Sequence, residues 1–227
     1  MKRLLLLLTI TLTTLVPAQE TIEKTVGEFT ELKVYDLLEV ELVESNINKV
    51  EITGQSSENV LINNKNGSLK IKMKLEKLLK GDNTKVTLYY TGLDVIDANE
   101  GSKVYGSDVI KQFEIDLKAQ EGASIKVPVD VSYTNIKAVT GGIVEVTGVS
   151  ESQKVTLLTG GIYKGENLQT KKTDVTVNAA GQADVKASVQ VDAKVRAGGN
   201  VNIYGNPKTV NETTVIGGNI KIIDKKK

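Results

Sequence analysis

Hydrophobic and polar residues alternate along most of this chain in short runs. The pattern is clear in residues 113–119, where the order is Phe-Glu-Ile-Asp-Leu-Lys-Ala, and it returns in residues 154–157 and 174–177. A period of two is typical of a β-strand that has one covered face, so these runs predict strands rather than helices.

A glycine turn interrupts these runs at regular intervals. Variants of one motif occupy residues 98–104, 119–125, 138–144, 157–163, 195–201 and 214–220, and a looser copy occupies residues 178–184. The key glycines of these turns are Gly101, Gly122, Gly141, Gly160, Gly181, Gly198 and Gly217. Their spacing of about 19 to 20 residues is typical of a solenoid and too short for the common helical repeats. Strands and repeat together predict an all-β fold, a parallel β-helix whose rungs contain about 19–20 residues.

The repeat also predicts a buried column. The residues three positions after the key glycines are apolar in all but one repeat: Val104, Ile125, Val144, Tyr163, Val201 and Ile220. Because stacked strands lie about 4.8 Å apart, these side chains are expected to pack one above the next inside the coil. Asp184 breaks the pattern, unless that turn is counted from Ala180, which places Ala183 in the column. We expect the glycines to serve turn geometry through positive φ.

The chain divides into three parts. Residues 1–18 read as a secretory signal peptide, with Lys2 and Arg3 before an apolar run and a cleavage site after Ala18. Residues 19–224 are expected to form a single β-helix domain, and residues 225–227 a basic tail. Within the domain, residues 19–92 should form less regular opening rungs of the same coil, with an inserted helical turn near 74–81 that covers the core. Residues 93–224 should hold the regular glycine-turn repeats.

Composition removes several classes of chemistry. The chain has no histidine and no cysteine, which excludes His- and Cys-based catalytic sets and disulfides. Its 29 basic and 28 acidic residues nearly balance, so no nucleic-acid partner is expected. Gly-Gly is followed by Ile or Asn rather than by the recurring Asp of calcium-binding rolls. We therefore expect no catalytic, metal-binding or cofactor-binding residues, and no cofactor.

Three groups of side chains are the remaining candidates. Asp94, Asp97 and Asp108, with Asp116 nearby, are the densest acidic group. Polysaccharide lyases and hydrolases use clustered carboxylates, but a basic partner here would have to be lysine, and we expect these groups to be solvated ends of strands. Asn200 and Asn219 occupy the same repeat position and are expected to stack as an amide ladder. Six tyrosines share no column and are expected in the core or at its rim: Tyr89, Tyr90, Tyr105, Tyr133, Tyr163 and Tyr204.

Several segments resemble a known family. Tyr-Gly-Asn-Pro-Lys at 204–208 and Val-Ile-Gly-Gly-Asn-Ile at 215–220 resemble the C-terminal end of the GIN-domain family, which is described as the head domain of auto-transporter adhesins. Residues 29–34, 40–42, 50–52 and 67–71 resemble its start, so the resemblance covers about residues 26–223. It implies a right-handed parallel β-helix, exported by Bacteroidetes-type bacteria and without established enzymatic activity. No functional residues can be transferred.

These observations favour an exported, non-catalytic β-helix protein. It would act as an adhesin or surface-binding module that recognises a protein or a glycan through its outer face. Its expected location is the periplasm, the outer-membrane surface or the medium, without an integral membrane span. Two alternatives stay open: a polysaccharide-active lyase or hydrolase that uses a carboxylate and a lysine, and a self-assembling structural component of the envelope. A flat outer face would also allow a homodimer.

Overall fold

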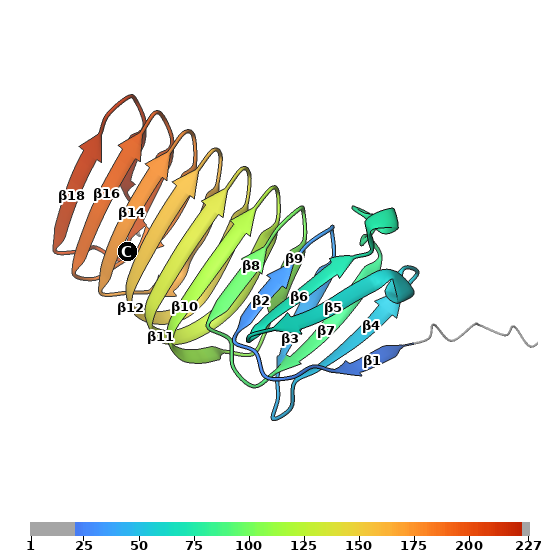
Figure 1. The fold of residues 1–227 in the computed structure, drawn as a ribbon. Helices are drawn as coiled ribbons and strands as arrows, with labels where there is room; N and C mark the ends of the chain where they lie inside the picture. Colours follow the sequence, from blue (N-terminus) through green and yellow to red (C-terminus); the bar gives the residue numbers. More distant parts are fainter. Residues whose placement is uncertain (1–20, 224–227) are drawn as a thin grey trace, which may run out of the picture.

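A computed structural model describes residues 21–223, which form one elongated stack of strands (Figure 1). The predicted signal peptide and basic tail lie outside the described residues. The N-terminal part contains β1 (Ile22–Thr25), β2 (Glu31–Val34), β3 (Glu39–Glu44), β4 (Lys49–Gly54), the 3-10 helix η1 (Ser57–Asn59), β5 (Val60–Lys65), β6 (Ser68–Met73), the 3-10 helix η2 (Leu75–Lys77) and β7 (Thr84–Tyr90). The regular part contains β8 (Val95–Ala98), β9 (Lys103–Gly106), β10 (Ile110–Gln120), β11 (Ser124–Val139), β12 (Ile143–Leu158), β13 (Ile162–Gln169), β14 (Lys172–Asn178), β15 (Gln182–Lys186), β16 (Gln190–Arg196), β17 (Asn200–Tyr204), β18 (Thr209–Thr214) and β19 (Asn219–Ile222).

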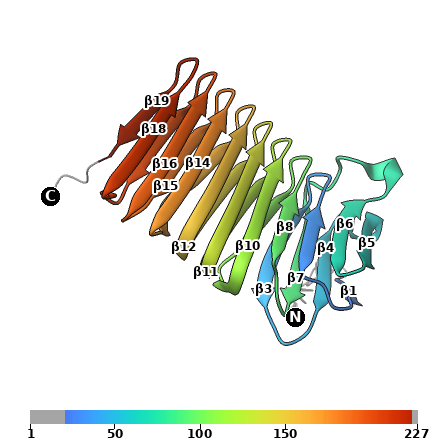
Figure 2. The same cartoon turned by 60° about the vertical axis from the view of Figure 1, so that its left-hand side comes forward.

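The regular part is a two-faced coil of parallel strands, and the predicted β-solenoid is confirmed. One face consists of β8, most of β10, the second halves of β11 and β12, and then β14, β16 and β18. The second face consists of β9, the first halves of β11 and β12, and then β13, β15, β17 and β19. Figure 2 shows the rungs stacked along one axis from the N-terminal strands to β18 and β19.

The apolar positions of successive rungs lie in register inside the coil. The pairing runs through Val104, Ile125, Val144, Tyr163, Ala183, Val201 and Ile220. All of these side chains are buried except that of Ile220, which is partly buried. Ala183, rather than Asp184, occupies the column in its rung, because that turn begins one residue earlier than its glycine suggests.

The turns between the two faces need two consecutive residues with positive φ, which is the requirement of a type I′ turn. Thr140 (φ 48°) and Gly141 (φ 73°) form one of them. Gly101, Gly122, Gly160 and Gly198 likewise follow a residue with positive φ, whereas in the last turn Gly217 (φ 65°) and Gly218 (φ 115°) are the consecutive pair. Gly181 does not: Ala179 (φ 59°) and Ala180 (φ 66°) form that turn instead. The expectation that Gly181 is the turn glycine is therefore wrong.

This exception gives a prediction for stability. Ala180→Gly is expected to raise the free energy of unfolding by about 0.5 to 1 kcal/mol. An L-residue in the left-handed region costs roughly 1–2 kcal/mol, and the extra freedom of glycine in the unfolded chain offsets only part of that. Urea unfolding followed by circular dichroism measures the change. A lower unfolding midpoint would contradict the turn assignment.

The sequence predicts that residues 19–92 form opening rungs of the same coil. The structure differs, because the N-terminal part does not continue the coil in chain order. The rung formed by β6 and β7 stacks outside β2 and β3, which therefore lie between it and the rung of β8 and β9. β5 runs antiparallel to β6, β4 antiparallel to β7 and β1 antiparallel to β4. Asn66 (φ 53°) and Gly67 (φ 77°) join β5 to β6. An Asn-Gly turn of this kind favours an antiparallel hairpin, so the local sequence prevails over the repeat here.

The segment around η2 also differs from expectation. It contains a single 3-10 turn, and its leucines do not cover the core: Leu75, Leu78 and Leu79 are 77%, 46% and 57% exposed. The base of the segment is fixed by Asp36, whose Oδ2 accepts a hydrogen bond from Met73 N at 3.0 Å. Its carbonyl oxygen accepts another from Gly81 N at 3.2 Å. The segment is thus an anchored loop with an apolar tip, replacing the tight turn of the other rungs.

Candidate functional site

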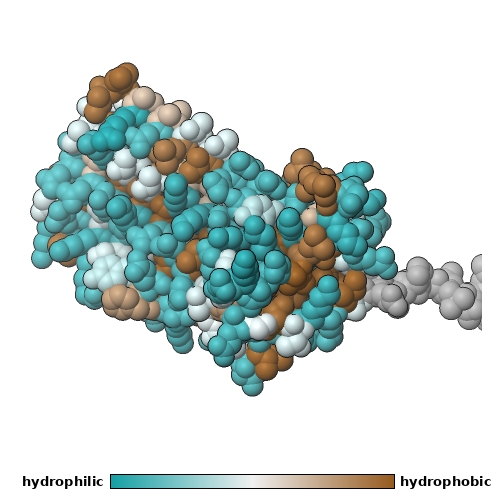
Figure 3. All heavy atoms as spheres, in the orientation of Figure 1, coloured by the Kyte–Doolittle hydropathy of each residue, from teal (hydrophilic) through white to brown (hydrophobic). Residues whose placement is uncertain are grey.

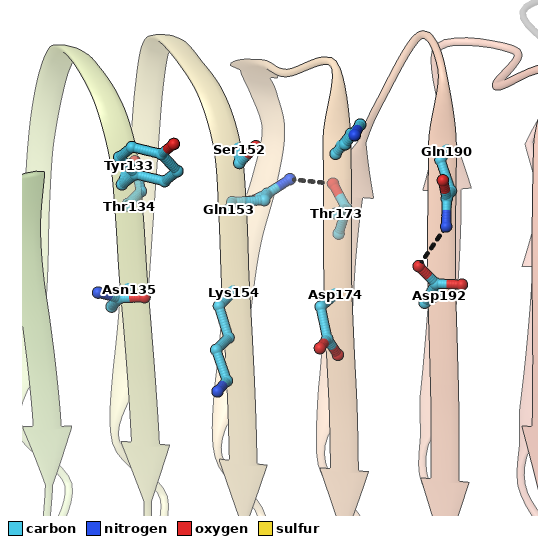
Figure 4. Close-up of a pocket in the computed structure, with 11 residues that line it drawn as sticks. Tyr133, Thr134, Asn135, Ser152, Gln153, Lys154, Thr173, Asp174, Gln190 and Asp192 are labelled. Atoms are coloured by element: carbon cyan, nitrogen blue, oxygen red, sulfur yellow. Dashed lines mark hydrogen bonds between the residues drawn. The ribbon is translucent and has the colours of Figure 1, made fainter.

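The first face of the coil carries a line of shallow hollows parallel to the solenoid axis. Three of them, of about 460, 440 and 390 Å³, follow one another across β8, β10, β11, β12, β14 and β16. The first two share Asp116, and the last two share Asn135 and Lys154. We call this continuous depression the groove, and Figure 4 shows the part that lies on β11 to β16.

Strand alternation and rung register place the side chains that line the groove. Each second residue of these strands points outward, and parallel pairing sets equivalent positions side by side. One row therefore runs Asp116, Asn135, Lys154, Asp174, Asp192 and Asn211. The members hydrogen bond to one another: Asn135 Nδ2 donates to Asp116 Oδ1 at 3.0 Å, and Asn211 Nδ2 donates to Asp192 Oδ1 at 2.7 Å. The row is a fixed array of amides, carboxylates and one ammonium group.

An exposed aromatic pair stands beside this array. Phe113 is 69% exposed and Tyr133 is 45% exposed. Their ring centroids are 5.3 Å apart with an interplanar angle of 62°, an edge-to-face arrangement. Phe113 lines the 460 Å³ hollow and Tyr133 the 390 Å³ hollow. The pair therefore offers flat apolar surface next to the polar row.

A buried hydrogen-bonded network supports the floor of the groove. Tyr163 OH donates to Gln153 Oε1 at 2.7 Å, and Gln153 Nε2 donates to Thr173 Oγ1 at 2.9 Å (Figure 4 shows the second bond). Burial raises the pKa of Tyr163 above its ordinary range, and the charge of Glu166 adds to the rise, so this phenol is a neutral donor. Thr134 lies in the same inward column, 1% exposed, and its hydroxyl has no hydrogen-bond partner among the described residues.

The structure separates the predicted acidic group. Asp94 and Asp116 line the same hollow. Two residues after Asp116 on β10, Lys118 lies opposite Asp97 of β8 in the strand register. Asp116 Oδ2 lies 3.4 Å from Lys118 Nζ. Asp108 is elsewhere, where its Oδ2 accepts a hydrogen bond from Glu44 N at 3.0 Å. Asp94 and Asp116 thus share one end of the groove, and Asp97 lies on the neighbouring strand β8 opposite Lys118.

The remaining candidates are spread over the molecule. Tyr163 is in the core and Tyr90 is buried, whereas Tyr105 OH donates to Glu39 Oε1 at 2.9 Å and Tyr89 OH to Glu51 Oε2 at 3.2 Å. The expected amide ladder is present, because Asn219 Nδ2 donates to Asn200 Oδ1 at 3.3 Å.

Phe113 was not predicted to be at a surface site. Its position in the alternating run gives it the same parity as Ile115 and Leu117, which are buried. β10 passes here from the second face of the coil to the first, because Gln112 pairs with Val131 at the end of the first half of β11 and Glu114 with Tyr133 at the start of its second half. This change of face turns the ring outward, and no sequence pattern marks it.

Residues 21–223 hold neither a cluster of candidate metal ligands nor a helix that could span a membrane. No group of three or more acidic residues is arranged to hold a metal ion in this part of the chain. Within the same range, no helix has the length and apolar character needed to cross a bilayer.

Comparison with known proteins identifies the family. A family model described as "Putative auto-transporter adhesin, head GIN domain" matches residues 28–207. The chain belongs to this GIN-domain family. The expectation drawn from the turn motifs is thereby confirmed, and the assignment associates the chain with adhesins. No curated protein sequence matches it.

Solved structures similar to this GIN-domain protein share its fold at low sequence identity. A "putative adhesin" from Bacteroides fragilis NCTC 9343 superposes with a TM-score of 0.84 at 17% identity, covering 91% of this chain and 98% of its own. A "putative lipid binding protein" from Parabacteroides distasonis ATCC 8503 gives 0.71 at 16%, covering 92% and 98%. A "putative adhesin" from Parabacteroides merdae ATCC 43184 gives 0.60 at 13%, covering 92% and 98%. At these identities the likeness establishes the fold alone.

Proposed function

We propose that this GIN-domain protein is a non-catalytic adhesin module of the cell exterior that binds a glycan chain along the groove. The observation that carries the proposal is the exposed Phe113–Tyr133 pair beside a row of amide, carboxylate and ammonium groups. Membership of an adhesin-head family agrees with a surface or extracellular location and with a binding role.

The chemistry of the groove suits a sugar polymer. The apolar faces of pyranose rings pack on aromatic rings. Their hydroxyls both donate and accept hydrogen bonds, which matches a row that contains donors such as the Asn135 amide and acceptors such as the Asp116 carboxylate. Long open depressions accept chains rather than small molecules, which prefer enclosed pockets. Repetition of similar side chains on each rung, about 4.8 Å apart, allows an extended ligand to make several contacts along the axis.

Truncation of the aromatic pair tests the proposal. Phe113→Ala combined with Tyr133→Ala is expected to weaken glycan binding by about tenfold or more, because aromatic anchors commonly contribute over 1 kcal/mol to an interface. Both rings are exposed, so the melting temperature should stay within a few degrees. Glycan arrays identify the ligand, and titration calorimetry measures its affinity in each variant.

A matched control uses an exposed apolar pair far from the groove. Val215→Ala with Ile216→Ala removes side chains that are 60% and 71% exposed in the last turn, and glycan affinity should not change. Equal loss of affinity in both double variants, or an array without any bound glycan, would sink the proposal.

The enzymatic alternative has one observation in its favour, the Lys118–Asp116 pair at 3.4 Å inside the groove. Incubation with uronate-containing and neutral polysaccharides, followed by measurement of unsaturated products and of reducing ends, tests it. We expect no increase over a blank without protein. Release of products that is lost in Lys118→Gln would replace the binding proposal by a catalytic one.

A further inference from the structure

The loop that contains η2 presents an unusual surface. In residues 74–80 the order is Lys-Leu-Glu-Lys-Leu-Leu-Lys. Its three leucines are 77%, 46% and 57% exposed, although the alternating strands beside it bury their apolar residues. Figure 1 shows the loop projecting from the N-terminal end of the coil between β6 and β7. The apolar side chains therefore stand at a tip rather than on a flat face.

The neighbourhood of the tip extends its apolar surface. Leu37 is 37% exposed and lies in the turn that the loop covers, since Gly81 N donates to the carbonyl of Asp36 at 3.2 Å. Leu61 on the adjacent hairpin is 39% exposed. In Figure 3 brown atoms gather over the end of the molecule that carries β5 and β6.

Basic side chains surround the leucines. Lys72, Lys77 and Lys80 are exposed and Lys74 is partly exposed. None of the four makes a salt bridge to any described residue. The acidic groups nearby are Glu76 within the loop, Asp82 just after it, and the exposed Glu58, which precedes Asn59, whose carbonyl accepts a hydrogen bond from Lys74 N at 2.8 Å. Beneath the loop lie the buried Asp36 and, against it, the partly exposed Glu100. The lysines therefore outnumber the exposed carboxylates around the tip.

We propose that residues 74–80 form a bilayer-contact loop, whose leucines enter the interface of an anionic membrane while its lysines bind lipid phosphate groups. Amphipathic segments with apolar and basic residues bind membranes through apolar burial and attraction to anionic lipid together. A tip with three large apolar side chains is much smaller than the roughly 800 Å² per partner that a stable protein interface needs. In a symmetric dimer through this tip, like-charged lysines would also face one another. A lipid surface avoids both problems.

A single tryptophan tests the proposal directly, because the chain contains none. Leu75→Trp places it at the tip, and Ile216→Trp places it at a turn of similar exposure, 77% against 71%, at the other end of the coil. With phosphatidylcholine vesicles containing phosphatidylglycerol, the fluorescence of Leu75→Trp should shift to shorter wavelength, whereas that of Ile216→Trp should not. An equal shift at both sites, or none at the tip at any phosphatidylglycerol content, overturns the inference.

Co-sedimentation with the same vesicles separates the two contributions. Leu75→Ser, Leu78→Ser and Leu79→Ser together should weaken binding by about tenfold or more, as should Lys74→Gln, Lys77→Gln and Lys80→Gln together. Binding should fall with added salt and be weak on phosphatidylcholine alone. The control Val215→Ser with Ile216→Ser should bind like the unmodified protein.

The remaining outcomes are equally informative. Phe113→Ala with Tyr133→Ala should leave vesicle binding unchanged, so failure of the glycan proposal and failure of this one are distinguishable. If the leucine variant binds vesicles as well as the unmodified protein does, the loop is not the contact. If sedimentation without lipid shows dimers that the leucine variant lacks, the tip serves a second copy of the chain, and the membrane assignment is overturned.

Discussion

Replacement of Val144 by aspartate is expected to lower the free energy of unfolding by about 3 kcal/mol or more, because an unpaired charge would enter the apolar interior. Val144 is fully buried, and it is paired with Ile125 on one side and Tyr163 on the other, in the middle of the coil. Neither neighbour can donate a hydrogen bond to the carboxylate, since Ile125 has no polar side chain and the Tyr163 hydroxyl already donates to Gln153. Urea unfolding monitored by circular dichroism measures the loss.

The same strand supplies a control of identical chemistry. Val149 also lies on β12 but is 44% exposed. Val149→Asp should change the free energy of unfolding by no more than about 0.5 kcal/mol, as surface substitutions usually do. Similar unfolding midpoints for the two variants would show that the inward column does not hold the coil together.

Gly148→Ala is the second substitution with a large expected effect, about 3 kcal/mol of destabilisation. Gly148 has φ 104°, where L-residues are strained. A Cβ added there would lie 2.1 Å from the carbonyl oxygen of Val129 on the neighbouring rung. Backbone must therefore move in a strand that pairs on both sides, which adds a packing penalty to the conformational one. Thermal and urea unfolding give the size of the effect.

Gly141→Ala separates the two causes. Gly141 has φ 73°, but a Cβ at this position would meet nothing within 4 Å. Only the left-handed conformation is then unfavourable, and the expected loss is about 1 kcal/mol. If Gly141→Ala proves as harmful as Gly148→Ala, steric approach between rungs is not what makes Gly148 necessary.

The repeat made the regular part of the fold predictable. Period-two alternation determines which side chains point inward, and a spacing of about 19 residues determines which of them meet. Gly148 shows the limit of this reasoning, since it lies within a strand and outside the turn motif. Its necessity arises from the approach of Val129 on another rung, which no single repeat reveals.

The N-terminal part and the candidate site were harder to predict from the sequence, each for a different reason. Stacking of β6 and β7 outside β2 and β3 is a choice among long-range pairings that short alternating runs cannot distinguish. The Asn66–Gly67 hairpin was readable from its turn residues, but its consequence for strand direction was missed. Phe113 joins Tyr133 at the groove only because β10 changes face there, and alternation assigned its ring to the interior.

The arrangement of β2 and β3 determines how the N-terminal part joins the coil. Ser45 N donates to the carbonyl of Tyr90 at 2.9 Å, so the chain leaves the coil and re-enters it at neighbouring points. Between these points lies the whole of β4 to β7, while β2 and β3 already pair with β8 and β9 as successive turns would. The segment is thus an excursion from an otherwise continuous winding. Among the described residues, its strands pair with the coil only at β2 and β3, so the bilayer-contact loop is carried by a segment separate from the rungs of β8 to β19.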